Sequence, residues 1–188
     1  MIRLVDERPV HVPAREALLD EAFGDARFTK TSARLRDGYL PAKDLSLIAL
    51  DGAAVTGSVR LWHVAAGPRR PALLLGPLAV AAQRQGEGIG SALMEEAIER
   101  ARALGHRAIL IVGDAPYYAR FGFEAALTTG LWLPGPVERE RFLGLELVSG
   151  ALDGAAGLVS PTGRRVARPA LRTLLRAATA AEDFARAA

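Results

Sequence analysis

The chain has 188 residues, of which 50% are hydrophobic and 24% are charged, and its formal net charge is +3. These values are typical of a single globular domain that buries a sizeable core. The chain has no cysteine, which excludes disulfides, cysteine nucleophiles and zinc–thiolate sites. Its three histidines are widely spaced, so we expect no metal site.

The positive charge belongs to the C-terminal segment. From Gly154 onward there are six arginines and two acids, a balance of +4, so the first 153 residues carry a balance of −1. This body gives no electrostatic argument for nucleic acid. No apolar run reaches the roughly 18 residues of a membrane-spanning helix, and Met1–Arg8 does not resemble a signal peptide. We therefore expect a cytoplasmic protein.

The first half of the chain is predicted to form a strand, a helix and an antiparallel meander. The expected elements are a strand at Ile2–Val5, a helix at Pro13–Phe23, a weaker helix at Thr31–Asp37, and strands at Leu45–Leu50, Ala54–Val64 and Leu73–Val80. The first helix has apolar residues at helical spacing, and Gly24 is a suitable end for it. Asp51-Gly52 is typical of a two-residue hairpin turn.

The second half begins with a glycine-rich loop and is predicted to continue the sheet. The expected elements are a helix at Ile89–Leu104, a strand at Ala108–Val112, a short helix at Pro116–Arg120, and strands at Phe123–Leu133 and Phe142–Val148. Because one helix separates Leu73–Val80 from Ala108–Val112, we expect these two strands to be parallel, as in a βαβ unit. The predicted fold class is α+β with a mixed sheet.

Composition divides the chain near residue 153. Residues 1–153 are expected to form the folded domain, and residues 154–188 an Ala/Arg-rich C-terminal tail. Pro169 is suited to begin a helix in this tail, because leucines follow it at helical spacing and arginines flank them. We expect that helix to be peripheral, with a helix that binds a partner or a membrane surface as the alternative.

The most informative segment is Gln83–Ser91, which places Gly86, Gly88 and Gly90 between a strand and a helix. Glycines let backbone amides approach an anion closely. The start of a helix adds unpaired N–H donors and the positive end of the helix dipole. The segment therefore predicts a site for a phosphorylated ligand.

Two common phosphate sites fit this segment poorly. A P-loop requires a lysine before its Ser/Thr, whereas Gly90 directly precedes Ser91. A dinucleotide fingerprint requires Gly-x-Gly-x-x-Gly immediately after the first strand of a parallel sheet. Here the glycines have the spacing Gly86-x-Gly88-x-Gly90 and follow predicted antiparallel hairpins. A dinucleotide-binding oxidoreductase is therefore a distant alternative.

Two motifs together indicate a coenzyme A site. Gln83-x-x-Gly86-x-Gly88 resembles the Gln/Arg-x-x-Gly-x-Gly/Ala motif of the GNAT superfamily of N-acetyltransferases, and Tyr117–Phe123 resembles that family's Tyr-x-x-x-Gly-Phe segment. Three further stretches look like the bacterial YhbS-like branch of the family, namely Leu75–Val80, Gly113–Tyr118 and Leu133–Pro136. The resemblance covers roughly residues 1–153 and says nothing about the tail.

The resemblance implies a GNAT-like fold, with a mixed, mostly antiparallel sheet, a splayed parallel pair of central strands and flanking helices. It implies acetyl-CoA as co-substrate, with the pantetheine arm between the splayed strands and the pyrophosphate at the glycine loop. Gly76-Pro77 suits a strand that bulges away from its neighbour. The residues expected to contact acetyl-CoA are Leu78, Ala79, Val80, Arg84, Gln85, Gly86, Glu87, Gly88, Ile89, Gly90, Ser91 and Asp114.

The implied reaction is direct transfer of the acetyl group from the thioester to a primary amine of a small molecule or protein. Tyr118 aligns with the family's tyrosine and is the candidate acid for the departing thiolate; the alternative is that it packs or hydrogen-bonds to the cofactor sulfur. A backbone amide near Ala79–Val80 is the candidate donor to the thioester oxygen. No base can be assigned. His63 is the nearest candidate, but a surface or satisfied histidine is the favoured interpretation of it. Asp114 acts through water or, as we expect, caps the short helix.

The acceptor side is expected to come from residues 24–43 and 128–141, with Arg60 and Trp62 facing the same pocket. The expected partners are acetyl-CoA and an amine acceptor, with no nucleic acid and no membrane span, and a homodimer is the candidate assembly. The alternative function is a non-catalytic acyl-CoA-binding module or sensor on the same fold, which would not depend on Tyr118.

Overall fold

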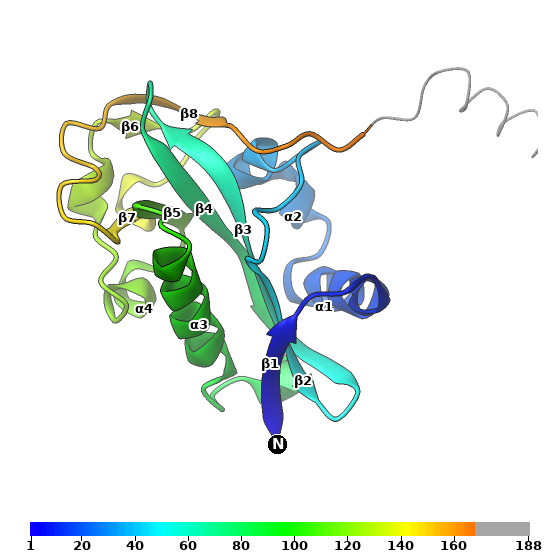
Figure 1. The fold of residues 1–188 in the computed structure, drawn as a ribbon. Coiled ribbons are helices and arrows are strands. Elements are labelled where there is room, and N and C mark those ends of the chain that lie inside the picture. Colours follow the sequence, from blue (N-terminus) through cyan, green and yellow to red (C-terminus); the bar gives the residue numbers. More distant parts are fainter. Residues whose placement is uncertain (168–188) are drawn as a thin grey trace, which may run out of the picture.

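A computed structural model describes residues 1–167 of the chain. These residues form one mixed sheet with the strand order β1-β2-β3-β4-β5-β7 and helices on both faces (Figure 1). The strands are β1 (Ile2–Asp6), β2 (Ser46–Asp51), β3 (Ala54–Ala66), β4 (Pro71–Val80), β5 (Ala108–Val112), β6 (Leu131–Trp132), β7 (Phe142–Glu146) and β8 (Gly157–Pro161). The α-helices are α1 (Val12–Phe23), α2 (Ala26–Thr29), α3 (Ile89–Ala103) and α4 (Ala115–Ala119). The 3₁₀ segments are η1 (Pro9–His11), η2 (Thr31–Leu35), η3 (Ala82–Arg84), η4 (Ala125–Thr128) and η5 (Arg139–Arg141).

The first four strands form the predicted antiparallel meander. β1 pairs with β2, β2 with β3, and β3 with β4, all antiparallel. Asp51 pairs with Ala54, so the turn residues are Gly52 and Ala53, one residue later than predicted. Gly52 adopts a φ of +60°, which a tight hairpin turn of this kind favours. Among the described helices, none has the length and apolar character that crossing a membrane requires.

Side chains that alternate along β3 and β4 enter two separate cores. Leu61 and Leu73 pack with α3 on one face of the sheet, whereas Trp62 and Leu74 pack with Leu35 of η2 on the other. Helices α1 and α2 lie on the side of the sheet opposite to α3 (Figure 1). The cavity described below therefore has α1, α2 and η2 above the middle of the sheet.

Helix α3 forms as predicted because its apolar positions repeat at helical spacing. Leu93, Ala97 and Ala101 on this face are fully buried. At the other end, Gly105 adopts a φ of +79°, and the amide of His106 donates to Ala101 O at 3.0 Å. This left-handed glycine ends the helix and satisfies one of its last carbonyls.

The two central strands are parallel, as predicted, and they separate along their length. β4 and β5 pair only at Leu73 and Leu74 of β4. At Gly76-Pro77 the register of β4 on β3 shifts by one residue, and Trp62 Nε1 donates to the Gly76 carbonyl at 2.7 Å. Beyond this bulge, the second half of β4 no longer pairs with β5, so its edge on that side has no partner strand.

The predicted strand at Phe123–Leu133 is wrong. The segment contains η4 and only the two-residue strand β6. Thr128 Oγ1 donates to Phe142 O at 2.6 Å, and Arg139 donates to the carbonyls of Thr128, Thr129 and Leu131 at 2.7–2.8 Å. These side chains satisfy backbone groups that a strand would have paired with a neighbour. The weak helix predicted at Thr31–Asp37 is the 3₁₀ segment η2, preceded by the unpredicted α2.

The sheet extends beyond the predicted boundary at residue 153. Strand β8 pairs antiparallel with Val64–Ala66 of β3 and parallel with β6. Val159 in β8 is 1% exposed, so the segment from 154 to 167 contributes to the core. The helix predicted to begin at Pro169 lies outside the described residues.

Candidate active site

The glycine loop between η3 and α3 presents a continuous row of free amides. Within the described chain, the amides from Gly86 to Ser91 donate to no acceptor, and the first bond at this end joins Ala92 N to Gly88 O at 2.9 Å. Residues 85–88 are exposed. Because the row lies at the positive end of α3, it can bind an anion such as a pyrophosphate.

The three glycines of the loop have two different functions. Gly86 and Gly88 adopt φ values of +84° and +80°, which residues with a Cβ avoid. A Cβ at Gly90 would lie 2.9 Å from the Tyr117 hydroxyl, so this glycine permits a close contact between α3 and α4. Ile89 is 3% exposed, and its side chain belongs to the core, so only its backbone can take part in the site.

Arg84 is already neutralised by carboxylates. Its Nε donates to Glu87 at 2.8 Å, and its Nη1 donates to Asp51 at 2.6 Å. Hydrogen bonds to Glu87 and Asp51 hold the pKa of Arg84 above its ordinary value. The predicted contact of Arg84 with acetyl-CoA stays a prediction, and in this structure two carboxylates already hold its guanidinium. Arg84 instead ties the glycine loop to the tip of the β2–β3 hairpin.

Arg120 is a cation at the loop that the sequence analysis missed. Its Nη2 donates to Ser91 Oγ at 3.2 Å, and its guanidinium lies 4.5 Å from the centre of the Tyr117 ring. Among residues 1–167, no carboxylate pairs with Arg120 within 4.0 Å. Arg120 reaches the start of α3 only because α4 packs beside it. No local sequence pattern reveals this packing.

The splayed half of β4 exposes backbone groups toward β5. Ala81 N donates to Thr56 O at 2.9 Å on β3, and successive amides of a strand point to opposite sides. Ala79 shares the orientation of Ala81, so its amide faces β3. The amides and carbonyls of Leu78 and Val80 face the gap beside β5. The Val80 carbonyl accepts from Gln85 Nε2 at 3.5 Å. The amides of Leu78 and Val80 and the carbonyl of Leu78 are the groups of the three predicted β4 contacts that an extended ligand can pair with.

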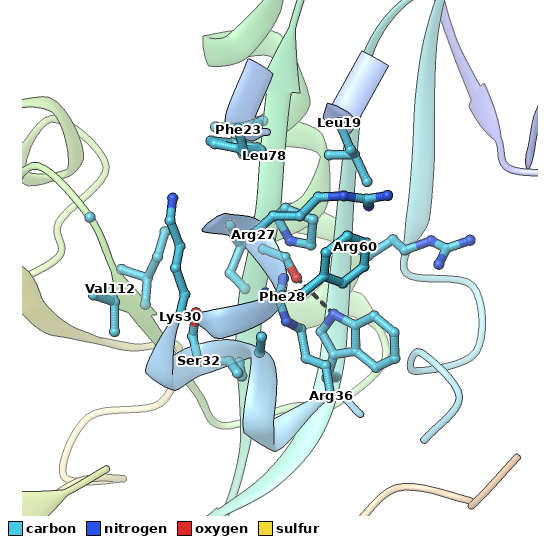
Figure 2. Close-up of a pocket in the computed structure, with 18 of the residues that line it drawn as sticks. Leu19, Phe23, Arg27, Phe28, Lys30, Ser32, Arg36, Arg60, Leu78 and Val112 are labelled. Carbon is cyan, nitrogen blue, oxygen red and sulfur yellow. Dashed lines mark hydrogen bonds between the residues drawn. The ribbon is translucent and has the colours of Figure 1, made fainter. Parts of the chain in front are cut away.

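A cavity of about 880 Å³ opens where β4 and β5 part. Its walls come from β3 and β4, from the end of β5 and α4, and from α1, α2 and η2 (Figure 2). The predicted site residues that line it are Arg60, Trp62, Leu78, Asp114 and Tyr118. The predicted acceptor segment 24–43 supplies much of the wall, and Arg141 represents the second predicted segment.

Tyr118 lies in the cavity wall with its ring packed between other groups. The ring makes edge contacts with Tyr117 and Phe123, with centroid distances of 4.9 and 6.0 Å. Burial, together with the neighbouring Tyr117 and Asp114, raises the pKa of Tyr118 to about 12. The hydroxyl makes no hydrogen bond within the described residues. It is a protonated donor at neutral pH.

The two base candidates differ in position. His63 does not line the cavity; it pairs with Leu73 at the closed end of β4 and lies 5.4 Å from the ring of His106. The position of His63 away from the cavity favours the interpretation of a surface or satisfied histidine over that of a base. Asp114 lines the cavity and precedes α4, but its side chain makes no capping hydrogen bond.

A buried ion-pair network supports the acceptor side. Glu7 accepts from Arg15 Nε at 3.1 Å and from Arg60 Nε at 2.7 Å, and the side chains of Glu7 and Arg15 are each 5% exposed. Arg15 also pairs with Glu16. The prediction that Arg60 and Trp62 face the pocket is confirmed, and both are held by hydrogen bonds to the scaffold.

Comparison with known proteins gives one family. The model of the acetyltransferase (GNAT) domain matches residues 42–125. The uncharacterized N-acetyltransferase YhbS of Escherichia coli is 33% identical over 156 residues, which cover 81% of this chain and 92% of that protein. The uncharacterized N-acetyltransferase YjhQ of the same organism is 33% identical over 124 residues, covering 64% of this chain and 68% of YjhQ.

Solved structures agree with the sequence comparison. The crystal structure of YhbS from Escherichia coli in complex with CoA has a TM-score of 0.71 at 32% identity and covers 86% of this chain and 89% of that chain. A GNAT family acetyltransferase from Brucella melitensis in complex with acetyl-CoA has a TM-score of 0.59 at 27% identity, over 89% of this chain and 96% of that chain.

Proposed function

Since this chain belongs to the GNAT family of N-acetyltransferases, we propose that it transfers an acetyl group from acetyl-CoA to a primary amine held in the cavity between β4 and β5. The observation that carries this proposal is the coincidence of two features. The free amides from Gly86 to Ser91 lie at one end of the gap, and Tyr118 lies in the wall of the same cavity.

Each part of acetyl-CoA has a matching surface. The row of loop amides, with Arg120 beside Ser91, suits the negatively charged pyrophosphate. The backbone groups of Leu78 and Val80 suit the amides of the pantetheine arm, which can pair with a strand edge. The complexes of the relatives from Escherichia coli with CoA and from Brucella melitensis with acetyl-CoA support this assignment.

Acetyl-CoA supplies the acetyl group as a thioester. During transfer a C–N bond forms, the C–S bond breaks, and one proton must pass from the amine nitrogen to the sulfur. A free backbone amide of Leu78 or Val80 is suited to donate to the thioester oxygen as it gains charge. The cavity holds the reacting groups side by side, which removes much of the entropic barrier.

In this proposal, Tyr118 is the group that donates a proton to the CoA sulfur. With a pKa of about 12, its hydroxyl is a weaker acid than a thiol, whose ordinary pKa is about 8.5. Complete transfer of the proton would cost about 5 kcal/mol at these values. Tyr118 therefore first stabilises the thiolate as a hydrogen-bond donor. Its proton passes to the sulfur only as the amine nitrogen releases a proton.

Binding of the co-substrate is tested by thermal unfolding with acetyl-CoA, NAD and ATP. A ligand at about 100 times its dissociation constant stabilises the folded state by roughly 2.7 kcal/mol, which raises the melting temperature by several degrees. We expect this shift with acetyl-CoA alone. A shift with NAD or ATP only would contradict the assignment of the site.

Catalysis is tested with Tyr118→Phe in an assay of CoA release against a panel of amines. Loss of a positioned proton donor should lower kcat about 10²-fold, while the affinity for acetyl-CoA stays nearly unchanged. Tyr39→Phe is the matched control, because it removes a phenol hydroxyl that does not line the cavity. Unchanged kcat in Tyr118→Phe would refute the role given to Tyr118. Binding of acetyl-CoA without CoA release from any amine of the panel, in the unaltered protein, would favour a non-catalytic acyl-CoA-binding module.

A further inference from the structure

The acceptor side of the cavity is rich in cations, and most of them are paired. Arg15 and Arg60 bind Glu7, and Arg27 Nη2 binds Glu16 and Asp20 at 2.6 and 2.8 Å. The paired carboxylates balance these three arginines. Four further cations line the same cavity, namely Lys30, Arg34, Arg36 and Arg141. Arg34 donates to Pro134 O at 2.8 Å, and Arg141 lies 3.9 Å from Glu138.

Arg36 has no compensating charge. Within residues 1–167, it forms no ion pair within 4.0 Å and no side-chain hydrogen bond. It is partly buried, and burial, with repulsion from Arg27, lowers its pKa to about 10. Asp37 and Asp114 line the same cavity but form no ion pair with Arg36 within 4.0 Å. Partial burial of an unpaired cation costs free energy, and a bound anion would reduce that cost.

A second, independent observation concerns Arg27. Its Nε is buried and is the side-chain atom within the described chain that lacks any hydrogen-bond partner. Buried N–H groups are normally satisfied, and exceptions often mark a functional site. Figure 2 shows Arg27, Lys30 and Arg36 around the same space, and all three come from the stretch between the start of α2 and the residue that follows η2. This part of the chain therefore brings an unpaired cation, Arg36, and an unsatisfied N–H donor, Arg27 Nε, to the acceptor side.

We propose that the amine acceptor also carries an anionic group, a carboxylate or a phosphate, which binds at Arg36 beside Arg27. This inference rests on the proposed function and adds the chemical class of the acceptor to it. An anion there would pair with the free guanidinium and reduce the repulsion between the two arginines. Lys30, whose ammonium lies 4.6 Å from the Phe23 ring centre, would add charge at longer range.

The acceptor amine remains neutral when it reacts, whereas its anionic group binds several atoms away. Such a division of tasks suits a molecule that has an amine at one end and an acid at the other. Guanidinium groups bind both carboxylates and phosphates through paired N–H donors. The guanidinium chemistry does not discriminate between a carboxylate and a phosphate, so the experiment includes ligands of both kinds.

The test uses conjugates in which CoA sulfur is joined through an acetyl bridge to an amine, so that binding requires no turnover. One set carries glycine, β-alanine or γ-aminobutyrate, and its partners carry the corresponding carboxamides. A phosphoethanolamine conjugate and an ethanolamine conjugate form the phosphate pair. Dissociation constants are measured by calorimetry for the unaltered protein, Arg36→Gln and Arg3→Gln. Arg3 is exposed and does not line the cavity, so Arg3→Gln controls for the loss of one charge.

We expect at least one carboxylate or phosphate conjugate to bind about tenfold or more tightly than its uncharged partner. The preference should disappear in Arg36→Gln and persist in Arg3→Gln. Equal binding within every pair, or a preference that survives Arg36→Gln, would overturn the proposal. Failure of acetyl-CoA itself to bind would instead refute the proposed function. Thermal unfolding verifies that Arg36→Gln is folded.

Discussion

At the scale of single residues, Tyr118 can occupy the cavity wall because position 113 has no side chain. A Cβ at Gly113 would lie 2.1 Å from Tyr118 Cε2, which is too close for two carbon atoms that are not bonded to each other. The ring therefore packs directly on the backbone that leaves β5, and Phe123 fixes its other edge. The position of the hydroxyl is thus set by the backbone and by aromatic packing.

This packing predicts a late titration of Tyr118. Its folded pKa of about 12 exceeds the ordinary value of about 10, so the folded state holds the proton more tightly than the unfolded chain does. The associated stability is complete below about pH 10 and is lost as the pH rises toward 12. The difference in tyrosinate absorbance between the unaltered protein and Tyr118→Phe should appear above pH 11. Ionisation near pH 10 would show that the phenol is well solvated.

Residues of the site differ in how far one sequence reveals them. The glycine loop is a short local motif that predicts a phosphate site by its own chemistry, and Tyr118 lies in a short segment that resembles one of the GNAT family, so both could be predicted. Arg120 and Arg36 reach the site through the packing of α4 and η2, and a lone arginine has no local pattern. His63 is the nearest candidate base along the chain, but the register of β3 on β4 places it at the closed end of the sheet, and no local pattern reveals that register.

At the scale of elements, the glycine loop is held in place before any ligand binds. Arg84 bridges Glu87 in the loop and Asp51 at the hairpin tip, and the N-terminal ammonium also pairs with Asp51 at 3.2 Å. These exposed pairs contribute little to stability individually. They do restrict the loop, and a restricted loop loses less entropy when it binds an anion.

Two matched glycine substitutions separate loop geometry from general strain. Gly86 and Gly105 both have positive φ values, +84° and +79°, and a Cβ would meet nothing within 4 Å at either position. Alanine should therefore destabilise the fold by a similar amount, roughly 1–2 kcal/mol, in both variants. Gly86→Ala should also weaken acetyl-CoA binding about tenfold, because it redirects the loop amides, whereas Gly105→Ala should leave it unchanged. Thermal unfolding and calorimetry measure the two effects, and equal affinities would contradict the assignment of the loop.

Elements with a strong periodic pattern could be predicted from the sequence, including α3 and the meander from β1 to β4. Helix α1 could be predicted as a helix, but its buried side was not evident, because Arg15 is buried there whereas Ala14 and Ala17 are exposed. The segment 123–133 could not be predicted, because its apolar residues suit a strand and the deciding contacts are distant. Arg139 and Thr128 satisfy the backbone there, and neither contact has a local signature. β8 was missed because its partner, the end of β3, lies about 90 residues earlier in the chain.

At the scale of the whole molecule, β8 makes the sheet continuous past the predicted boundary. It covers the end of β3, where Val64 and Ala66 are almost fully buried, and it pairs with β6. Residues 154–167 therefore support β3, the strand that also carries Arg60 and Trp62.

A chain shortened to residues 1–153 should therefore be less stable than one that ends at residue 167. Removing β8 deletes Val159 and exposes apolar residues of β3, at a cost of about 3 kcal/mol or more. For a chain of this size the melting temperature should fall by about 10 °C. Differential scanning calorimetry of the two shortened chains checks this, and equal melting temperatures would show that β8 adds nothing to the core.

The parting of β4 and β5 places a strand edge in the interior of the sheet. On an outer rim, an edge with free amides invites pairing with other protein chains and hence aggregation. Here the edge at Leu78 and Val80 lies between α3 on one face and α1 on the other. The helices leave room for a thin, extended ligand but not for a strand of another protein molecule. The free strand edge can therefore bind a ligand without promoting aggregation.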